Sequence, residues 1–519
     1  MLQALARRSA RHSAVTRIVP PPVGGWNTRD ALDSMPQQDA LTLDNWFPRE
    51  QDVVVRKGYL AHSDTGEGVA IRGLVSHNRG TSSKLIAFCN GMAFDVSTDT
   101  PSTLATGLDV AAEVFGFNMK GVSFYLNGAD AVQSYDGTTF GAATLGKDAA
   151  DASGQTLTLT ALTCGMAYKR RVYFGGDGSL GFWHGDVDEI SGNILFYFPL
   201  DTVMGKGGYL VAMGALTDDG GSGRNDFACF ISSEGQVAIF SGSDPTDATN
   251  WEIVGVYDIG EPVNRFGVVK YGADLVFITR SGYVPLSAVL SGALSKSDRY
   301  TLSDKISSEA TDAVERYGSN AAWRITAYPK SSMLIVNVPR TATTFDQHVM
   351  NTVTGAWCRF RGIAATDFAI HGTNCYFGST DGVVYRFDIG NMDGENGISA
   401  DAKTAWNYFK DAGRVKQFNL AQPIFVSNAA PLLQIGFAVD FRQHRDTGVV
   451  QAATATGSGV WDEAVWDTVT WAGSPNATRK WIGLSGVGYA GSLRVRAVDT
   501  EAEISWKSTR VLYQPGGPR

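Results

Sequence analysis

The sequence predicts a mainly β protein whose central part is a β-propeller of six or seven blades. The first observation is a repeated phrase of two short apolar runs joined by Gly, Asn, Asp or Ser, residues that tolerate the φ > 0 of tight hairpin turns. The phrase recurs near Leu85, Phe124, Val172, Phe227, Leu275, Leu334 and Cys375. Successive starts lie 39 to 59 residues apart, and a hairpin repeated every ~40–50 residues is the period of a propeller blade. The blade number stays at six or seven because a terminal strand, or residues 401–425, could complete the ring.

The length of the chain predicts more than one domain. Its 519 residues exceed the ~250–300 at which a single core stops growing. We expect a flexible basic arm at 1–22, an N-terminal helix and hairpin segment docked to the body at 23–60, the propeller at 61–395, and an antiparallel β-sandwich or barrel with a Trp-rich turn at 396–519. Three consecutive prolines end the arm, and the polar stretch 390–397 marks the last boundary.

Two short helices and one strand are predicted outside the hairpin phrases. Pro36 and the run 38–43 indicate a short helix, and 53–56 reads as a strand closed by Gly58. The second helix is indicated by apolar residues at helical spacing, with Ser303 or Asp304 as its N-cap. These apolar residues are Ile306, Ala310, Ala313, Val314 and Tyr317.

Acidic residues are concentrated in the repeat region. Residues 61–400 hold 23 Lys and Arg against 36 Asp and Glu, within a formal net charge of −8 for the whole chain. Such a region binds DNA poorly because phosphates need clustered Lys and Arg. It could form a wall past which DNA slides, or it could be an ordinary solvated acidic surface.

Cysteine usage and hydropathy indicate where the chain is assembled. The five cysteines form no C-x-x-C pair, so we expect neither a disulfide framework nor a zinc site, and assembly in a reducing cytosol. The longest apolar stretches, such as 209–216, are far shorter than ~18 residues, so no membrane insertion is expected. The arginines of the first 17 residues precede no apolar run. They indicate a basic arm, with a transit peptide as the alternative.

No motif for catalysis, a cofactor or a metal stands out. His184, Asp186 and Asp188 form the one histidine–carboxylate cluster, which suits either a metal or acid–base site or a polar blade loop. The run 391–396 lacks the frame of a calcium loop. Phosphate-loop and nucleophile-elbow motifs are absent. Trp461-Asp462 and Trp466-Asp467 are five residues apart, not the ~40–45 of WD repeats. We therefore expect a protein that is not an enzyme.

Five of the twelve tryptophans fall within the last 59 residues. They are Trp461, Trp466, Trp471, Trp481 and Trp506. Such rings could pack the core of a domain, anchor a subunit interface, or form a carbohydrate-binding platform.

The N-terminal residues resemble the signature of tail nozzle (hub) proteins from short-tailed bacteriophages, a group that includes the tail tubular protein B and packaged-DNA-stabilisation proteins. The matching elements are Gly25-Trp26-Asn27, Met35-Pro36 with Ala40, Leu43–Pro48, and Arg56 to Tyr59. The W-D-x-x-x-W-D-x-x-x-W run and the closing R-V-L-Y-Q-P-G-G at 510–517 resemble the C-terminal domain of the same proteins. Between these ends, the likeness is limited to the propeller rhythm.

The resemblance implies a structural virion protein of the tail, assembled in the host cytoplasm. It implies a hexameric ring below the portal and adaptor, a channel that passes double-stranded DNA without reading its sequence, and attachment of fibres or a needle. The residues implied as interface or structural candidates are Trp26, Asn45, Trp46, Trp461, Trp466 and Trp471. Candidates for an acidic channel lining are Asp218-Asp219, Asp186 and Asp188. The other classes left open are a secreted propeller lectin or glycan-active enzyme, and a receptor-binding tail protein.

Overall fold

The computed structural model describes residues 14–80, 82–176, 178–219, 224–290, 301–428, 432–442, 445–451, 458–459, 470–471 and 476–516. The chain divides into two compact units. Unit 1 comprises Met1–Gly58, Ala356–Phe360 and Gly390–Arg519, and unit 2 comprises Tyr59–Gly355 and Arg361–Ile389.

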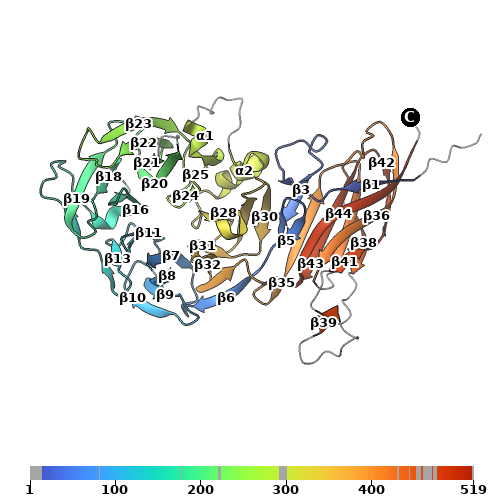
Figure 1. Ribbon diagram of the computed structural model, residues 1–519, viewed down its shortest axis with the longest axis horizontal. Coiled ribbons are helices and arrows are strands. Elements are labelled where there is room, and N and C mark those ends of the chain that lie inside the picture. Colours follow the sequence, from blue (N-terminus) through green and yellow to red (C-terminus); the bar gives the residue numbers. More distant parts are fainter. Residues whose placement is uncertain are drawn as a thin grey trace, which may run out of the picture. The chain divides into compact units, whose positions relative to one another are not determined.

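Unit 2 is a β-propeller, as the sequence predicts (Figure 1). Blade one consists of β7 (Ile71–Arg79), β8 (Ser82–Cys89), β9 (Met92–Asp95) and β10 (Ser102–Ala105). Blade two consists of β11 (Phe115–Met119), β12 (Val122–Leu126), β13 (Gln133–Tyr135) and β14 (Phe140–Ala142). Blade three consists of β16 (Leu162–Tyr168), β17 (Arg171–Gly176), β18 (Gly181–His184) and β19 (Gly192–Pro199), with β15 (Leu145–Lys147) parallel to β19.

The remaining blades vary more in their outer parts. Blade four consists of β20 (Leu210–Asp219), β21 (Arg224–Ser232), β22 (Gln236–Gly242) and β23 (Trp251–Asp258). Blade five has β24 (Val268–Tyr271), β25 (Asp274–Thr279) and β26 (Gly282–Pro285), followed by α1 (Leu286–Leu290). Blade six contains β27 (Arg324–Tyr328), β28 (Met333–Pro339) and β29 (Phe345–Asn351). Blade seven consists of β31 (Ala365–His371), β32 (Asn374–Ser379), β33 (Val383–Phe387) and β6 (Tyr59–Asp64).

The described residues close a ring of seven blades. The first strands of successive blades lie side by side in the order β7, β11, β16, β20, β24, β27 and β31, and β31 returns to β7. Blade seven is completed by β6, which comes before the rest of the propeller in the chain and pairs with β33, Tyr59 opposite Phe387. The terminal strand that left the blade number open is therefore β6. Aromatic packing joins neighbouring blades, as where Phe182 of blade three stacks on Phe230 of blade four with ring centroids 4.2 Å apart.

The two expected helices have different outcomes. The helix around 306–317 is confirmed as α2 (Ser307–Tyr317), but its N-cap position is occupied by Ile306. Neither Ser303 nor Asp304 caps it, because a 3-10 turn over Asp304–Ile306 comes first. The helix expected at 38–43 is wrong: this segment is the strand β3 (Asp39–Asp44). Six residues are too few for a stable isolated helix, and β35 (Asn396–Thr404) supplies β3 with antiparallel backbone partners instead.

Unit 1 is a sandwich of two mainly antiparallel sheets. Sheet A contains β1 (Val15–Val19), β4 (Trp46–Pro48), β5 (Val53–Val55), β36 (Lys416–Ser427), β41 (Asn476–Arg479), β42 (Ile482–Gly488) and β44 (Ile504–Pro515). Sheet B contains β2 (Gly25–Trp26), β3, β35, β37 (Leu432–Val439), β38 (Arg445–Gln451) and β43 (Gly491–Thr500). Phe418 of sheet A and Phe437 of sheet B meet between them with ring centroids 4.9 Å apart.

The N-terminal region belongs to this sandwich. Where the sequence predicts a flexible arm, residues 15–19 form β1 and pair along β44, Val15 opposite Tyr513 and Val19 opposite Thr509. The sequence predicts a helix and hairpin segment at 23–60 that docks to the body; in the structure, residues up to 58 cluster with 390–519. The reason is strand pairing: β3 and β5 pair with β35 and β44 from the opposite end of the chain.

Candidate functional site

Charged side chains bridge the propeller at the end where its inner strands begin. Arg324, the first residue of β27, donates from Nε to Asp367 Oδ1 at 2.9 Å and from Nη2 to Glu113 Oε1 at 3.0 Å. Its guanidinium carbon also lies 3.5 Å from the ring centroid of Phe266. Arg265, which precedes β24, donates to the backbone carbonyls of Glu113 and Asn127. We call Glu113, Arg265, Arg324 and Asp367 the axial network.

The axial network joins blades that are not neighbours. Glu113 precedes the inner strand of blade two, whereas Arg265 and Arg324 introduce blades five and six, so these contacts span the ring. Side chains of Arg324 and Asp367 are 5% and 8% exposed. Burial raises the pKa of the Asp367 carboxyl, and the Arg324 charge and the N–H groups of Leu74 and Phe368 oppose this rise. These contacts tie blade two to blades five, six and seven.

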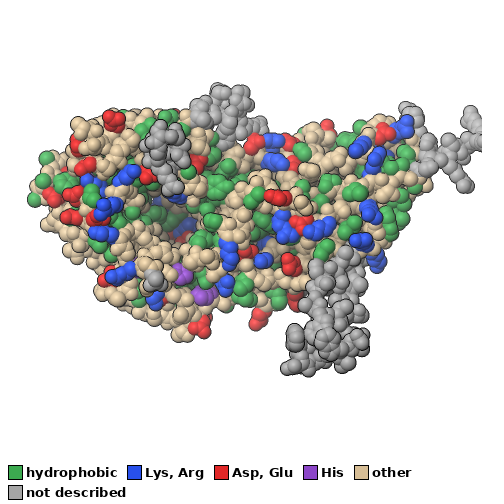
Figure 2. Space-filling view, viewed as in Figure 1, with side chains coloured by type: hydrophobic (Ala, Val, Ile, Leu, Met, Phe, Trp, Pro, Cys, Tyr) green, Lys and Arg blue, Asp and Glu red, His purple; other side chains and the backbone are tan. Residues whose placement is uncertain are grey.

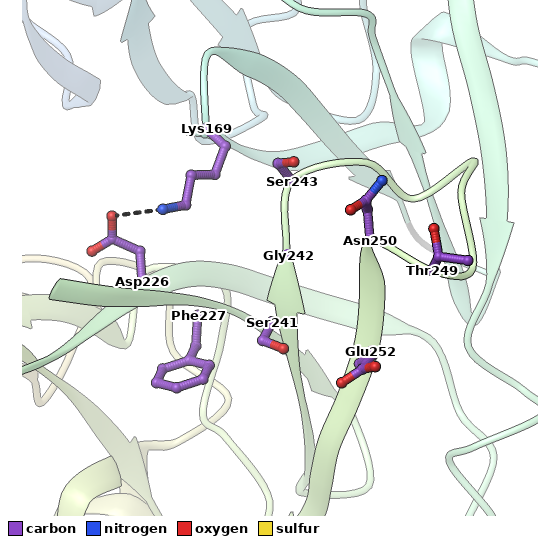
Figure 3. Close-up of a pocket in the computed structure, with 9 residues that line it drawn as sticks. All are labelled: Lys169, Asp226, Phe227, Ser241, Gly242, Ser243, Thr249, Asn250 and Glu252. Atoms are coloured by element: carbon purple, nitrogen blue, oxygen red, sulfur yellow. Dashed lines mark hydrogen bonds and ion pairs between the residues drawn. The ribbon is translucent and has the colours of Figure 1, made fainter. Parts of the chain in front are cut away.

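A surface pocket lies at the rim of blade four, next to the turn between β16 and β17 of blade three (Figure 3). Its volume is about 620 Å³. It is lined by Lys169, Asp226, Phe227, Ser241, Gly242, Ser243, Thr249, Asn250 and Glu252. Lys169 Nζ lies 3.2 Å from Asp226 Oδ2, and both side chains are more than one third exposed. With two carboxylates against one ammonium group, the pocket suits a polar neutral or cationic ligand.

The histidine–carboxylate cluster of the sequence is split by the fold. His184 is buried in β18 among aromatic rings, and burial lowers its pKa to about 4. Asp186 pairs with Arg171 at 2.9 Å, and Asp188 pairs with Arg170 and Lys120. These two carboxylates are therefore neutralised by cations, which weakens them as an acidic lining. The side chains of Asp218 and Asp219 lie outside the described residues.

In the loop 391–396, the carboxylate of Asp393 binds an arginine from elsewhere in unit 1. Arg56 is buried and donates from Nη1 to Asp393 Oδ1 at 2.7 Å and from Nη2 to Asp393 Oδ2 at 2.5 Å. The guanidinium thus occupies the carboxylate that a cation would need. Among the described residues, no three His, Cys, Asp or Glu side chains are grouped to hold a metal ion.

The N-terminal signature forms a buried corner in unit 1. Asn45 has φ of 58° in the left-handed region, accepts from Arg56 Nε at 2.9 Å and donates to the Ser399 carbonyl at 2.8 Å. Asp44 receives two hydrogen bonds from Arg359 at 2.8 and 3.0 Å. The same guanidinium lies 4.9 Å from the ring of Trp26. A short polar side chain at Asn45 suits this backbone because Asn adopts the left-handed region more readily than most residues.

The structure places the named tryptophans as follows. Trp26 and Trp46 are buried, at 3% and 0% exposure, and Trp46 meets Trp506 edge-on at 6.2 Å between ring centroids. They pack the inside of unit 1 and are not exposed for a second chain. Trp461 and Trp466 lie outside the described residues. For Trp471 only the backbone is described, in β40 (Thr470–Trp471), which pairs with β39 (Ser458–Gly459).

Sequence reasoning missed the axial network. Asp367 and Arg324 each interrupt a strand phrase that is otherwise largely apolar, and this is the signal that could have identified them. Their partners cannot be paired from sequence because Glu113 and Arg324 are 211 positions apart.

Comparisons with known proteins add little beyond the β-rich fold. No family model and no curated protein match the chain. Sqt1 of Saccharomyces cerevisiae is similar with a TM-score of 0.37 and 10% identity, over 65% of this chain and 100% of that chain. BamB from Moraxella catarrhalis gives 0.34 and 14%, over 67% and 96%. An exo-β-1,3-galactanase from Phanerochaete chrysosporium gives 0.26 and 8%, over 77% and 95%. At these values the names of the three proteins say nothing about this one. In the described residues, no helix is long and apolar enough to span a membrane.

Proposed function

We propose that this protein is a structural component of a short-tailed phage virion, the tail nozzle or hub, and that it forms a hexameric ring. The observation that carries the proposal is the N-terminal signature. The residues that resemble the family, Trp26, Asn45, Trp46 and Arg56, form one buried corner of unit 1. A signature that specifies architecture suits a scaffold.

In this proposal, DNA passes between copies of the protein. The axial network bridges the propeller, so the hole of a single propeller is not the conduit. Unit 2 carries 22 Lys and Arg against 34 Asp and Glu, a net charge of −12. Like charge keeps phosphates from lodging on such a surface, and salt confines this repulsion to ~8–10 Å. The ring would contact the adaptor and portal on one side and fibres or a needle on the other, and would act without catalysis or cofactor.

The native mass of the purified full-length protein tests the proposal. We expect a species near six times 55.6 kDa, seen as a ring by negative-stain electron microscopy. We also expect no binding of duplex DNA with a sub-micromolar Kd at ~150 mM salt, because a conduit must release its cargo. A protein that stays monomeric at tens of micromolar, or that binds DNA tightly with a steep salt slope, would contradict the proposal.

The rim pocket favours one alternative, a glycan-binding propeller. It offers hydroxyl, amide and carboxylate groups from Ser241, Asn250 and Glu252. Glycan-array binding that is lost on Glu252→Ala, with the fold intact, would support this alternative. We expect no such binding.

A further inference from the structure

The strands of sheet A contain no acidic residue. The seven strands hold five Lys or Arg and no Asp or Glu. The basic residues are Arg17, Lys416, Arg479, Lys507 and Arg510. Unit 1 as a whole carries 22 Lys and Arg against 18 Asp and Glu, a net charge of +4, whereas unit 2 carries −12.

The outward side of sheet A combines aliphatic and arginine side chains. Strand register places Leu420 opposite Leu512, Arg510 opposite Ile18, and Ile424 opposite Arg479. The neighbouring inward positions, such as Phe418, Ala421 and Val511, are buried in the sandwich, so these pairs face outward. Ile18 and Val487 are 66% and 65% exposed. We call Ile18, Leu420, Ile424, Arg479, Val487, Arg510 and Leu512 the outer face.

The two arginines of the outer face have no acidic partner among the described residues. Lys507 is different, because it pairs with Asp52 at 2.5 Å, and Lys416 is buried against three backbone carbonyls. In unit 2 the unpaired charges are of the opposite sign. Many of its cations are paired, while exposed carboxylates lack a cation partner in the described chain. These carboxylates are Asp99, Glu189, Asp201, Glu234, Glu252 and Glu315.

We propose that the outer face of sheet A binds the acidic propeller of a second copy of this chain. Two observations select this occupant. Exposed aliphatic side chains beside arginines are typical of protein interfaces. A phosphate backbone makes no favourable contact with aliphatic side chains. The propeller of another copy supplies unpaired carboxylates to meet the two arginines.

The size of the outer face is suitable for such a contact. β36 and β44 each have 12 residues, which at ~3.3 Å per residue gives a length of ~40 Å. The strands β1, β44, β36 and β42 span three spacings of ~4.8 Å, so the flat area is ~570 Å² before side-chain relief is added. A standard interface buries ~800 Å² per partner, so the outer face can supply most of one side.

This contact explains how copies of the chain could assemble into the proposed ring. That the ring closes rests on the proposed function. A basic sheet that binds an acidic propeller is a contact between unlike surfaces, which leads head to tail from copy to copy. Such heterologous contacts close into rings when the rotation allows. In Figure 2, Lys and Arg side chains are visible in the part of unit 1 where Figure 1 places β36, β42 and β44.

The test compares two double variants of the full-length protein by mass in solution. Arg479→Glu with Arg510→Glu reverses the outer face. Lys410→Glu with Arg442→Glu makes the same change in charge on exposed residues of unit 1 outside sheet A. We expect the first pair to raise the concentration for half-assembly at least ~10-fold, and the control pair to change it less than ~2-fold. Raising salt from ~50 to ~500 mM should weaken assembly of the wild type and have little effect on residual assembly of the first pair.

The possible outcomes separate this inference from the proposed function. Rings that form unchanged with the Arg479/Arg510 pair would refute the outer face as the contact and leave the ring intact. A wild type that never assembles would refute both proposals. If the pair assembles normally but loses binding to a 30-base-pair duplex probe, the outer face contacts DNA instead, and the inference fails. Far-ultraviolet circular dichroism of each variant checks for misfolding. Leu512→Asp is a second variant that disrupts the outer face, by placing an acidic residue there without changing an arginine.

Discussion

Removal of the Arg324 guanidinium should destabilise unit 2 by about 3–5 kcal/mol. In Arg324→Met the aliphatic stem remains, but the charged hydrogen bonds to Asp367 and Glu113 are lost. At about 1.5–3 kcal/mol for each charged hydrogen bond, the loss is about 3–6 kcal/mol, consistent with the 3–5 kcal/mol cost of breaking a buried pair by removing one partner. Among the described residues, Asp367 then keeps the N–H groups of Leu74 and Phe368 as donors, and its carboxylate is still out of water.

Hydrogen exchange read by mass spectrometry is the suitable assay, because peptides from β7, β27 and β31 report on unit 2 alone. The matched control is Arg316→Met, which breaks an ion pair with Asp312 in which both side chains are more than half exposed, and which should cost at most about 0.5 kcal/mol. The double variant Arg324→Met with Asp367→Asn should recover at least about 1 kcal/mol of the loss, because the unpaired charge is gone. If the two substitutions have additive effects in the double variant, or if Arg324→Met and the control are equally protected, the Arg324–Asp367 ion pair contributes no coupling energy to stability.

Three further predictions concern a backbone corner, a histidine and the cysteines. Asn45→Ala should destabilise unit 1 by about 2–3 kcal/mol, since it leaves Arg56 without one partner and strains a φ of 58°. In denaturant unfolding, Asn45→Gly should lower the free energy of unfolding less than Asn45→Ala does, and the opposite order would contradict the backbone strain. Burial lowers the pKa of His184 to about 4, so as the pH falls below 6.5 the imidazole is protonated in the unfolded chain before it is protonated in the folded one. The free energy of unfolding should therefore drop by up to about 3 kcal/mol between pH 6.5 and 4. His184→Gln should flatten this dependence on pH, and an unchanged dependence would assign it to other groups. Burial raises the pKa of the Cys229 thiol to about 12 and those of Cys89, Cys358 and Cys375 above the usual range, so a thiol reagent at pH 8 should label none of these four before unfolding. Fast labelling of any of them in peptide mapping would show a local opening of the structure around that cysteine.

The sequence predicts the repetitive part of this fold better than the parts joined across the chain. Hairpin phrases are local, so a turn such as Asn90-Gly91 between β8 and β9 can be recognised from its neighbours alone. The strand β3 could not be, because its partner β35 lies more than 350 residues away and the local pattern also fits a helical turn. The same limit applies to the axial network, where burial and distant partners, not motif spacing, bring the charges together.

The way in which β6 completes blade seven also affects how the chain can fold. Tyr59 and Phe387 are opposite each other, so a finished propeller holds its own two ends together. Apart from Ala356–Phe360, unit 1 is built from the segments before and after those ends. Joining these two segments across ~330 disordered residues would cost about 5 kcal/mol in loop-closure entropy. A propeller that forms first removes most of that cost, which makes unit 1 dependent on unit 2 during synthesis. Pulse-labelling hydrogen exchange during refolding should therefore show protection in β7–β33 before β36 and β44, and the reverse order would rule out this dependence.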